Sequence, residues 1–173
     1  MKRFALALLT VSLTIPAAME AKPTKPVTLP EAIRHQLVML PRYSVFDNLA
    51  FQVDGGTVTL TGEVTKPILK DDAAYAVKHV EGVTMVINNI EVLPLSPYDD
   101  RIRLAVYRAI YSAPTISARY GLQAVPSIHI IVKNGVVRLE GVVANEADRT
   151  IAGLRAKGVF GAFEVDNDLQ IGS

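Results

Sequence analysis

Apolar and polar residues alternate on both sides of an Asp-Gly-Gly sequence in the segment FQVDGGTVTLTGEV, residues 51–64. Alternation with a period of two is typical of a strand that buries one face. Glycine supplies the positive φ angles that a tight turn between two strands requires. The segment therefore predicts a β-hairpin.

The same pattern returns in IHIIVKNGVVRLEGVV, residues 128–143, where an Asn-Gly turn separates the two predicted strands. A shift of 79 positions places Gly62 on Gly141, and the match continues without a gap to Asn88 on Asn167. A constant offset that keeps glycines and apolar residues together indicates an internal duplication. The chain is therefore predicted to contain two copies of one unit.

The repeated glycines are predicted to be structural. Those in the turns allow positive φ angles. Gly62 and Gly141 fall late in a strand, where glycine permits a bulge or the close approach of a neighbouring backbone. A phosphate-binding loop is disfavoured because no Gly-rich loop followed by Lys-Ser/Thr occurs. The predicted structural glycines are Gly56, Gly62, Gly82, Gly135, Gly141 and Gly161.

Each hairpin is followed by a segment with helical spacing and then by a third strand. Residues 71–80 place their apolar side chains on one face of a helix. In the second copy Asn145 is expected to cap the helix, with Asp148 three residues later. The third strands are predicted over residues 85–92 and 163–171.

Each hairpin is also preceded by a predicted helix. The sequence TLPE, which begins at Thr28, is a capping-box pattern, and the helix that it opens is expected to end near Pro41. In the second copy Ser96 and Pro97 form a similar helix start, with proline at the first helical position. That helix is expected to end near Pro114.

These elements predict an α+β fold of two tandem αββαβ units, each a three-stranded sheet with two helices on one face. The order of the strands stays open, because the third strand could return beside either earlier strand. The predicted boundaries are residues 28–94 for the first unit and 99–173 for the second, joined by a linker of residues 95–98.

The N-terminal segment has the layout of a secretory signal. Lys2 and Arg3 precede an apolar run, and small residues follow towards Ala21. The run is shorter than the ~20 residues that span a bilayer, so a cleaved signal over residues 1–21 is favoured over an uncleaved anchor. Removing Lys2, Arg3 and Glu20 from the 18 basic and 17 acidic residues leaves 16 of each.

Composition argues against several classes of function. A chain with balanced charge is not built to capture nucleic acid. The chain has no cysteine, so a disulfide, a thiolate metal site and an attached lipid are not expected. His35, His79 and His129 lack the spacing of metal ligands. No nucleophile elbow or paired acid and base is recognisable. We therefore predict no catalytic residue, no metal and no cofactor.

The first helix of the second copy has two apolar sides. Ile102, Val106 and Ile110 fall on the side that should face its own sheet. The opposite side carries a second apolar and aromatic stripe beside arginines, which must be covered. One explanation is packing by the first copy or by the loop that follows the helix. The other is contact with phospholipid, with tyrosines at headgroup depth and arginines on phosphate. The candidate lipid- or partner-binding residues are Arg101, Leu104, Tyr107, Arg108, Tyr111 and Tyr120.

Both copies contain G-x-V-x-L-x-G-x-V, then a helix, a glycine and V-x-N-x-[IL]-x-[VI], an arrangement that resembles the BON (bacterial OsmY and nodulation) domain family. The resemblance implies a non-enzymatic periplasmic module of the envelope. BON domains are proposed to bind phospholipid surfaces or other envelope components, and a lipoprotein with two such domains contacts anionic phospholipid through its second. The second copy departs from the pattern in SAPTISARYGLQAVPS, which is longer than the corresponding stretch and is either decoration or a binding loop.

The resemblance and the residues together predict a periplasmic protein that binds anionic phospholipid, mainly through its second unit, and supports envelope integrity or osmotic-stress tolerance. The alternative is a protein-interaction or chaperone-like module for exported or outer-membrane proteins. The oligomeric state stays open.

Overall fold

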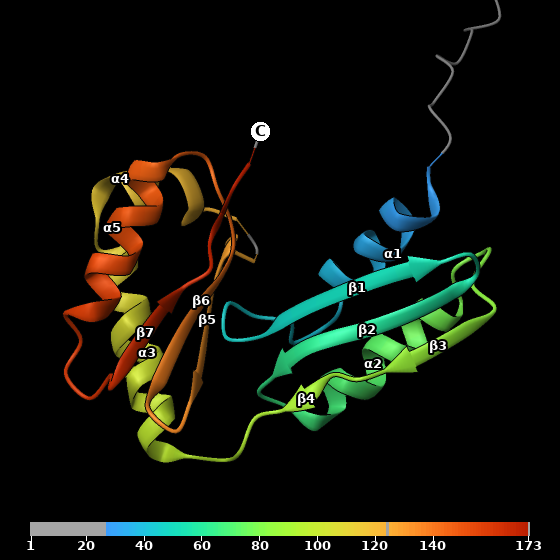
Figure 1. Ribbon diagram of the computed structural model, residues 1–173, viewed down its shortest axis with the longest axis horizontal. Coiled ribbons are helices and arrows are strands. Elements are labelled where there is room, and N and C mark those ends of the chain that lie inside the picture. Colours follow the sequence, from blue (N-terminus) through green and yellow to red (C-terminus); the bar gives the residue numbers. More distant parts are fainter. Residues whose placement is uncertain (1–26, 124, 173) are drawn as a thin grey trace, which may run out of the picture.

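The structure, a computed structural model, describes residues 27–123 and 125–172, so the predicted signal over residues 1–21 lies outside the described residues. It contains two successive units, each with its own sheet (Figure 1). The first unit comprises α1 (Leu29–Val38), β1 (Asn48–Asp54), β2 (Thr57–Val64), α2 (Pro67–Lys78), β3 (Met85–Asn88) and β4 (Glu91–Val92). The second comprises α3 (Pro97–Tyr111), α4 (Pro114–Tyr120), β5 (Ile128–Lys133), β6 (Val136–Val143), α5 (Glu146–Lys157), β7 (Glu164–Asn167) and β8 (Gln170–Ile171).

The two sheets have the same topology. In the first unit β2 is central, antiparallel to β1 and parallel to β3 and β4. In the second unit β6 occupies the central position between β5 and the pair β7 and β8. The crossover through α2 or α5 therefore returns the third strand to the free side of the central strand, which answers the question of strand order. The predicted α+β fold of tandem αββαβ units is confirmed.

The third strand of each unit is interrupted just after an asparagine that both copies share, Asn88 and Asn167. Asn88 Nδ2 donates to the carbonyl of Lys70 in α2 at 2.9 Å, and its Oδ1 accepts from the Ile90 N–H at 3.2 Å. This local bond turns the chain between β3 and β4 and directs Ile90 into the core, where it is 1% exposed. Asn167 makes the equivalent bond to the carbonyl of Arg149 at 2.9 Å. The repeated asparagine therefore fixes each helix to its third strand.

Helix starts follow the predicted capping residues. The Glu31 carboxylate accepts from the Thr28 N–H at 2.8 Å. The Ser96 hydroxyl accepts from the N–H of the residue three positions later at 3.2 Å, and Asn145 does the same at 2.9 Å. The helix predicted over residues 71–80 instead begins at Pro67, because Leu69 extends its buried face by one turn.

Helix α4 occupies the stretch that is longer in the second copy. Its Tyr120 hydroxyl donates to Asp148 Oδ2 at 2.7 Å and accepts from the Ala144 N–H at 2.8 Å. Arg119 lies 2.5 Å from the same carboxylate oxygen. Burial raises the pKa of Asp148, but the bonds from Tyr120 and Arg119 outweigh burial and hold that pKa below its ordinary value. In the first unit the equivalent position is the fully buried Leu69. The stretch is therefore a helix attached to the start of α5.

Gly62 and Gly141 lie where a neighbouring backbone carbonyl leaves no room for a side chain. Their φ angles are +112° and +115°, a region that side chains with a Cβ rarely adopt. A Cβ on Gly62 would lie 2.1 Å from the Asn48 carbonyl oxygen, and one on Gly141 would lie 2.0 Å from that of Ser127. The predicted close approach is confirmed, and both the angle and the contact exclude a side chain.

We expect Gly141→Ala to lower the free energy of unfolding by about 2 kcal/mol or more, because it combines a strained φ angle with a backbone clash. The measurement is the denaturant midpoint of unfolding. Gly158→Ala is the matched control, because Gly158 has a φ of −78° and an added Cβ would meet its nearest atom at 3.6 Å. Equal effects of the two substitutions would contradict the assignment.

Candidate functional site

The predicted binding face of α3 is divided in the structure. Arg101, Leu104 and Arg108 lie outward, and Leu104 is 45% exposed. Tyr107 is half-buried, because its ring packs against the ring of Phe46 from the first unit, with centroids 6.1 Å apart. The first unit therefore covers part of this stripe, as the packing explanation requires.

The two remaining tyrosines of the predicted set make internal contacts. Tyr111 lies 4.7 Å from the Tyr107 ring, centroid to centroid, and its hydroxyl donates to the Ile128 carbonyl at 3.1 Å. Burial raises the pKa of Tyr111, and the neighbouring Tyr107 adds to this. Tyr120 is only 6% exposed and both of its hydroxyl bonds are internal to the second unit. The structure therefore places Tyr120 apart from the outward face of α3.

A short segment of the first unit, residues 43–47, docks on the second unit. We call it the docking segment. Its Val45 is 8% exposed and lies in the hydrophobic core of the second unit. The Val45 carbonyl accepts from the N–H of Ile130 in β5 at 2.7 Å, so the segment occupies part of the free edge of that strand. The connection between α1 and β1 reaches β5 in Figure 1.

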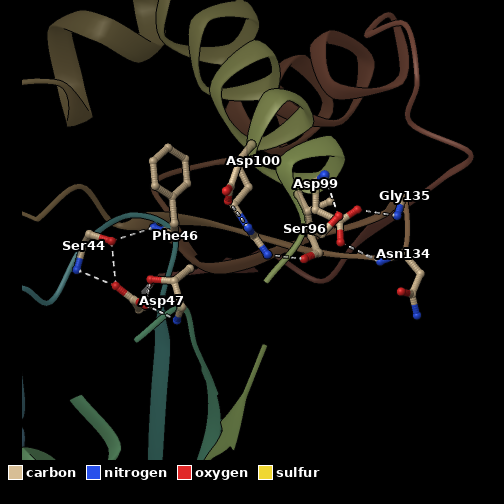
Figure 2. Close-up of polar contacts among 11 residues, drawn as sticks. Ser44, Phe46, Asp47, Ser96, Asp99, Asp100, Asn134 and Gly135 are labelled. Atoms are coloured by element: carbon tan, nitrogen blue, oxygen red, sulfur yellow. Dashed lines mark hydrogen bonds and ion pairs between the residues drawn. The ribbon is translucent and has the colours of Figure 1, made fainter. Parts of the chain in front are cut away.

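The carboxylate of Asp47 holds the docking segment in shape (Figure 2). Oδ2 accepts from the N–H and the hydroxyl of Ser44 at 3.0 and 2.6 Å. Oδ1 accepts from the N–H and the hydroxyl of Thr65, just after β2, at 2.7 and 2.8 Å. The side chain has no exposed area. Four hydrogen bonds to this buried carboxylate offset its loss of hydration. Without them, burying the charge would be strongly unfavourable.

Tyr43 and His129 form the aromatic part of this interface. Their rings stack with centroids 5.5 Å apart and an interplanar angle of 28°. Burial raises the pKa of Tyr43 to about 12. Burial lowers the pKa of His129, although the backbone of the docking segment and the Asp47 charge favour its protonated form. The imidazole is therefore neutral in the folded protein near neutral pH.

Charged side chains add a second contact between the units. Arg138 of β6 pairs with Glu63 of β2, and its Nε lies 2.8 Å from Glu140 Oε1. Lys133 pairs with Glu91 at 2.5 Å, but each of these side chains is about half exposed. Exposed pairs contribute little to stability. The half-exposed pair therefore adds little to the attachment that the buried docking segment and the partly buried Arg138–Glu63 pair provide.

The N-terminal end of α3 is fixed to the hairpin turn of the second unit. The Asp99 carboxylate, 1% exposed, accepts from the backbone N–H groups of Asn134 and Gly135 at 3.0 and 2.9 Å (Figure 2). Arg103 donates to the Val132 carbonyl at 2.6 Å and pairs with Asp100 at 2.5 Å. The turn and the helix end thus form one rigid edge.

Two exposed phenylalanines at this edge were not among the predicted site residues. Phe160 is 102% exposed and Phe163 is 77% exposed, both in the connection between α5 and β7. The apolar pattern predicted that Phe163 would begin the third strand, but β7 begins one residue later. A comparison of the two copies could have found them. At the equivalent positions the first copy has the polar residues Glu81 and Thr84, so the fold does not require a phenylalanine there.

Among residues 27–123 and 125–172, no group of three or more His, Cys, Asp or Glu side chains is arranged to hold a metal ion. His79 Nδ1 lies 2.7 Å from the carbonyl of Tyr75, which accounts for one ring nitrogen locally. Within the same part of the chain, no helix combines the length and apolarity needed to cross a membrane.

The structure thus defines a tandem αββαβ repeat protein in which a segment of the first unit docks on the second. A sequence profile of the BON domain matches residues 31–94 and 98–173. The chain belongs to the BON family.

Curated and solved proteins show further similarity. The chain is 33% identical over 128 residues to the osmotically-inducible protein Y of Escherichia coli (strain K12), covering 71% of this chain and 61% of that protein. The C-terminal domain of CdsD, the structural protein of the type III secretion system of Chlamydia trachomatis, aligns with 87% of this chain and 100% of its own, at 14% identity and a TM-score of 0.33. A second CdsD structure aligns with 84% of this chain and 93% of its own, at 14% identity and a TM-score of 0.31.

The neutral state of His129 predicts a loss of stability in acid. Below the ordinary pKa of about 6.5 the unfolded chain takes up a proton that the folded interface resists, so stability falls as the pH drops through 6.5 towards the lowered folded pKa. Between pH 7.5 and 5.5 the wild type should lose about 1 kcal/mol more than His129→Phe, which keeps a ring against Tyr43. Denaturant unfolding at the two pH values measures this, and parallel losses would refute it.

Proposed function

We propose that the protein is exported to the periplasm and binds the anionic phospholipid surface of the envelope through its second unit, supporting envelope integrity under osmotic stress. Its BON family membership and its similarity to an osmotically-inducible protein support this role. The signal-like sequence of residues 1–21 supports export. The role is one of binding and requires no catalytic group.

The observation that carries the proposal is the outward face of α3. Arg101, Leu104 and Arg108 remain exposed after the first unit has covered Tyr107. Arg101 also lies over the ring of Tyr98, with its guanidinium carbon 5.9 Å from the ring centroid. Guanidinium groups bind phosphate oxygens through several N–H donors, and an apolar side chain between them enters the headgroup layer. This combination suits an anionic lipid surface.

The balanced charge of the chain makes the attraction local. With 16 basic and 16 acidic residues left after residue 21, as counted from the sequence, no long-range field draws the protein to a membrane. The interaction should therefore depend on a few cations close to the lipid, and salt should weaken it.

A protein-binding role is the second candidate, and the edge strand β3 favours it. Met85 and Ile87 are 57% and 41% exposed on this strand, which pairs only through its β2 side in the described sheet. An exposed edge strand with apolar side chains can accept an extended segment of another protein. Under this alternative, binding to vesicles would be absent and partner binding would be lost when Ile87 is replaced by lysine.

Replacing Arg101 and Arg108 together with glutamate should reduce binding to anionic vesicles about tenfold or more, because each cation near such a surface contributes about 1 kcal/mol. Flotation of the chain lacking residues 1–21, with anionic and with zwitterionic vesicles at low and high salt, measures the effect. The thermal unfolding midpoint should change little, because exposed charges contribute little to stability.

The matched control is the pair Arg34→Glu and Lys78→Glu, which makes the same change in net charge on exposed positions of the first unit. This control should bind as the wild type does. Equal losses in both variants would show that only net charge matters, and no flotation of the wild type would overturn the proposed function.

A further inference from the structure

The connection between α5 and β7 presents aromatic side chains to solvent at one end of the second unit. We call residues 158–163 the aromatic loop. Its Phe160 is 102% exposed and its Phe163 is 77% exposed. Aromatic side chains remove a large apolar area from water when they are covered, so leaving two of them exposed in one loop is costly unless something covers them.

The loop is held in place although its side chains are exposed. The Tyr98 hydroxyl of α3 donates to the Gly161 carbonyl at 2.9 Å. The rings of Tyr98 and Phe163 stack with centroids 6.1 Å apart and an interplanar angle of 29°. Phe163 also lies on Gly135, where an added Cβ would come within 2.4 Å of its ring. The aromatic loop is therefore built onto the rigid edge that Asp99 forms between α3 and the hairpin turn.

The repeat shows that this exposure is not demanded by the fold. At the equivalent positions the first unit carries Glu81 and Thr84, both exposed and polar. The glycine that precedes β7 is shared, since Gly82 and Gly161 have φ angles of +90° and +97°. The two loops thus share a glycine with the same backbone conformation and differ in their side chains. The exposed aromatic residues are therefore a feature of the second unit alone at these positions.

Cations flank the aromatic loop. Arg101 lies over Tyr98, and the exposed Lys157 ends α5 immediately before the loop. Of the nearby acids, Asp99 is buried in the turn and Asp100 pairs with Arg103, while the exposed Glu164 directly follows the loop at the start of β7. A protruding aromatic tip with cations behind it matches a bilayer whose phosphates lie above its acyl chains. Phe160 projects fully into solvent, which suits a deformable surface.

We propose that the aromatic loop enters the interfacial region of an anionic bilayer, with Phe160 deepest, Phe163 and Tyr98 at headgroup level, and Arg101 and Lys157 on phosphate. This inference rests on the proposed function and adds the point of insertion. The N-terminal end of α3, which carries Tyr98 and Arg101, then lies nearest the lipid.

A single tryptophan tests the insertion, because the chain has none of its own. In Phe160→Trp, addition of vesicles that contain phosphatidylglycerol should shift the emission to shorter wavelength, and lipids brominated in the acyl chains should quench it. Glu81→Trp places the same reporter at the equivalent position of the first unit, and its emission should stay unchanged. Both positions are exposed, so both variants retain the packed core.

Flotation of Phe160→Ser supplies the second measurement. Loss of the ring that would insert into the bilayer should reduce vesicle binding about tenfold or more. The unfolding midpoint should stay unchanged, because the Phe160 side chain is fully exposed in the folded protein. If the wild type floats while the introduced tryptophan shows neither shift nor quenching, the loop does not insert and the inference is overturned alone. If the wild type does not float, the proposed function fails with it.

A second copy of the chain is the other possible cover for the loop. Sedimentation of the wild type in the absence of lipid distinguishes it, because a dimer joined by the aromatic loop would dissociate in Phe160→Ser. That result would overturn insertion, whereas a monomer in both variants, together with the shift in emission, supports it.

Discussion

A single buried carboxylate determines how the two units meet. Asp47 accepts four hydrogen bonds from Ser44 and Thr65, and these bonds shape the segment that carries Val45 into the core of the second unit. The carboxylate cannot be moved without leaving a buried charge unpaired. The two units therefore share one packed boundary, and the outward faces of the second unit have a defined orientation relative to the first.

The duplication supplies a frame in which the two copies have diverged at their surfaces. Gly62 and Gly141 meet the same backbone contact, and Asn88 and Asn167 make the same bond to a helix. The second copy then adds α4, which is fixed by Asp148 where the first copy has only an apolar side chain. Shared residues thus maintain the sheet and helices, while the added residues alter the surface that other molecules meet.

The sequence was sufficient for features that depend on local chemistry. Hairpin turns, caps and the two close-approach glycines follow from residue types within a few positions of one another. It was insufficient where the outcome depends on distant parts of the chain. In the sequence Val45 belongs to a loop, and only the folded chain shows its carbonyl bonded to the edge of β5. Phe163 has the pattern of a first strand residue, but its ring packs outside the sheet against Tyr98 and Gly135. Comparing the copies position by position identifies such departures better than hydrophobicity alone.

The hydrogen bond from Ile130 to Val45 affects how open the edge of β5 is to pairing with another chain. Strand β5 reads IHIIVK, a run of β-branched residues of the kind that pairs with identical strands in aggregates. The first unit is synthesised before this strand and places its own backbone on the strand's open edge. The first copy of the repeat therefore shields part of this edge of the second copy from pairing with other strands.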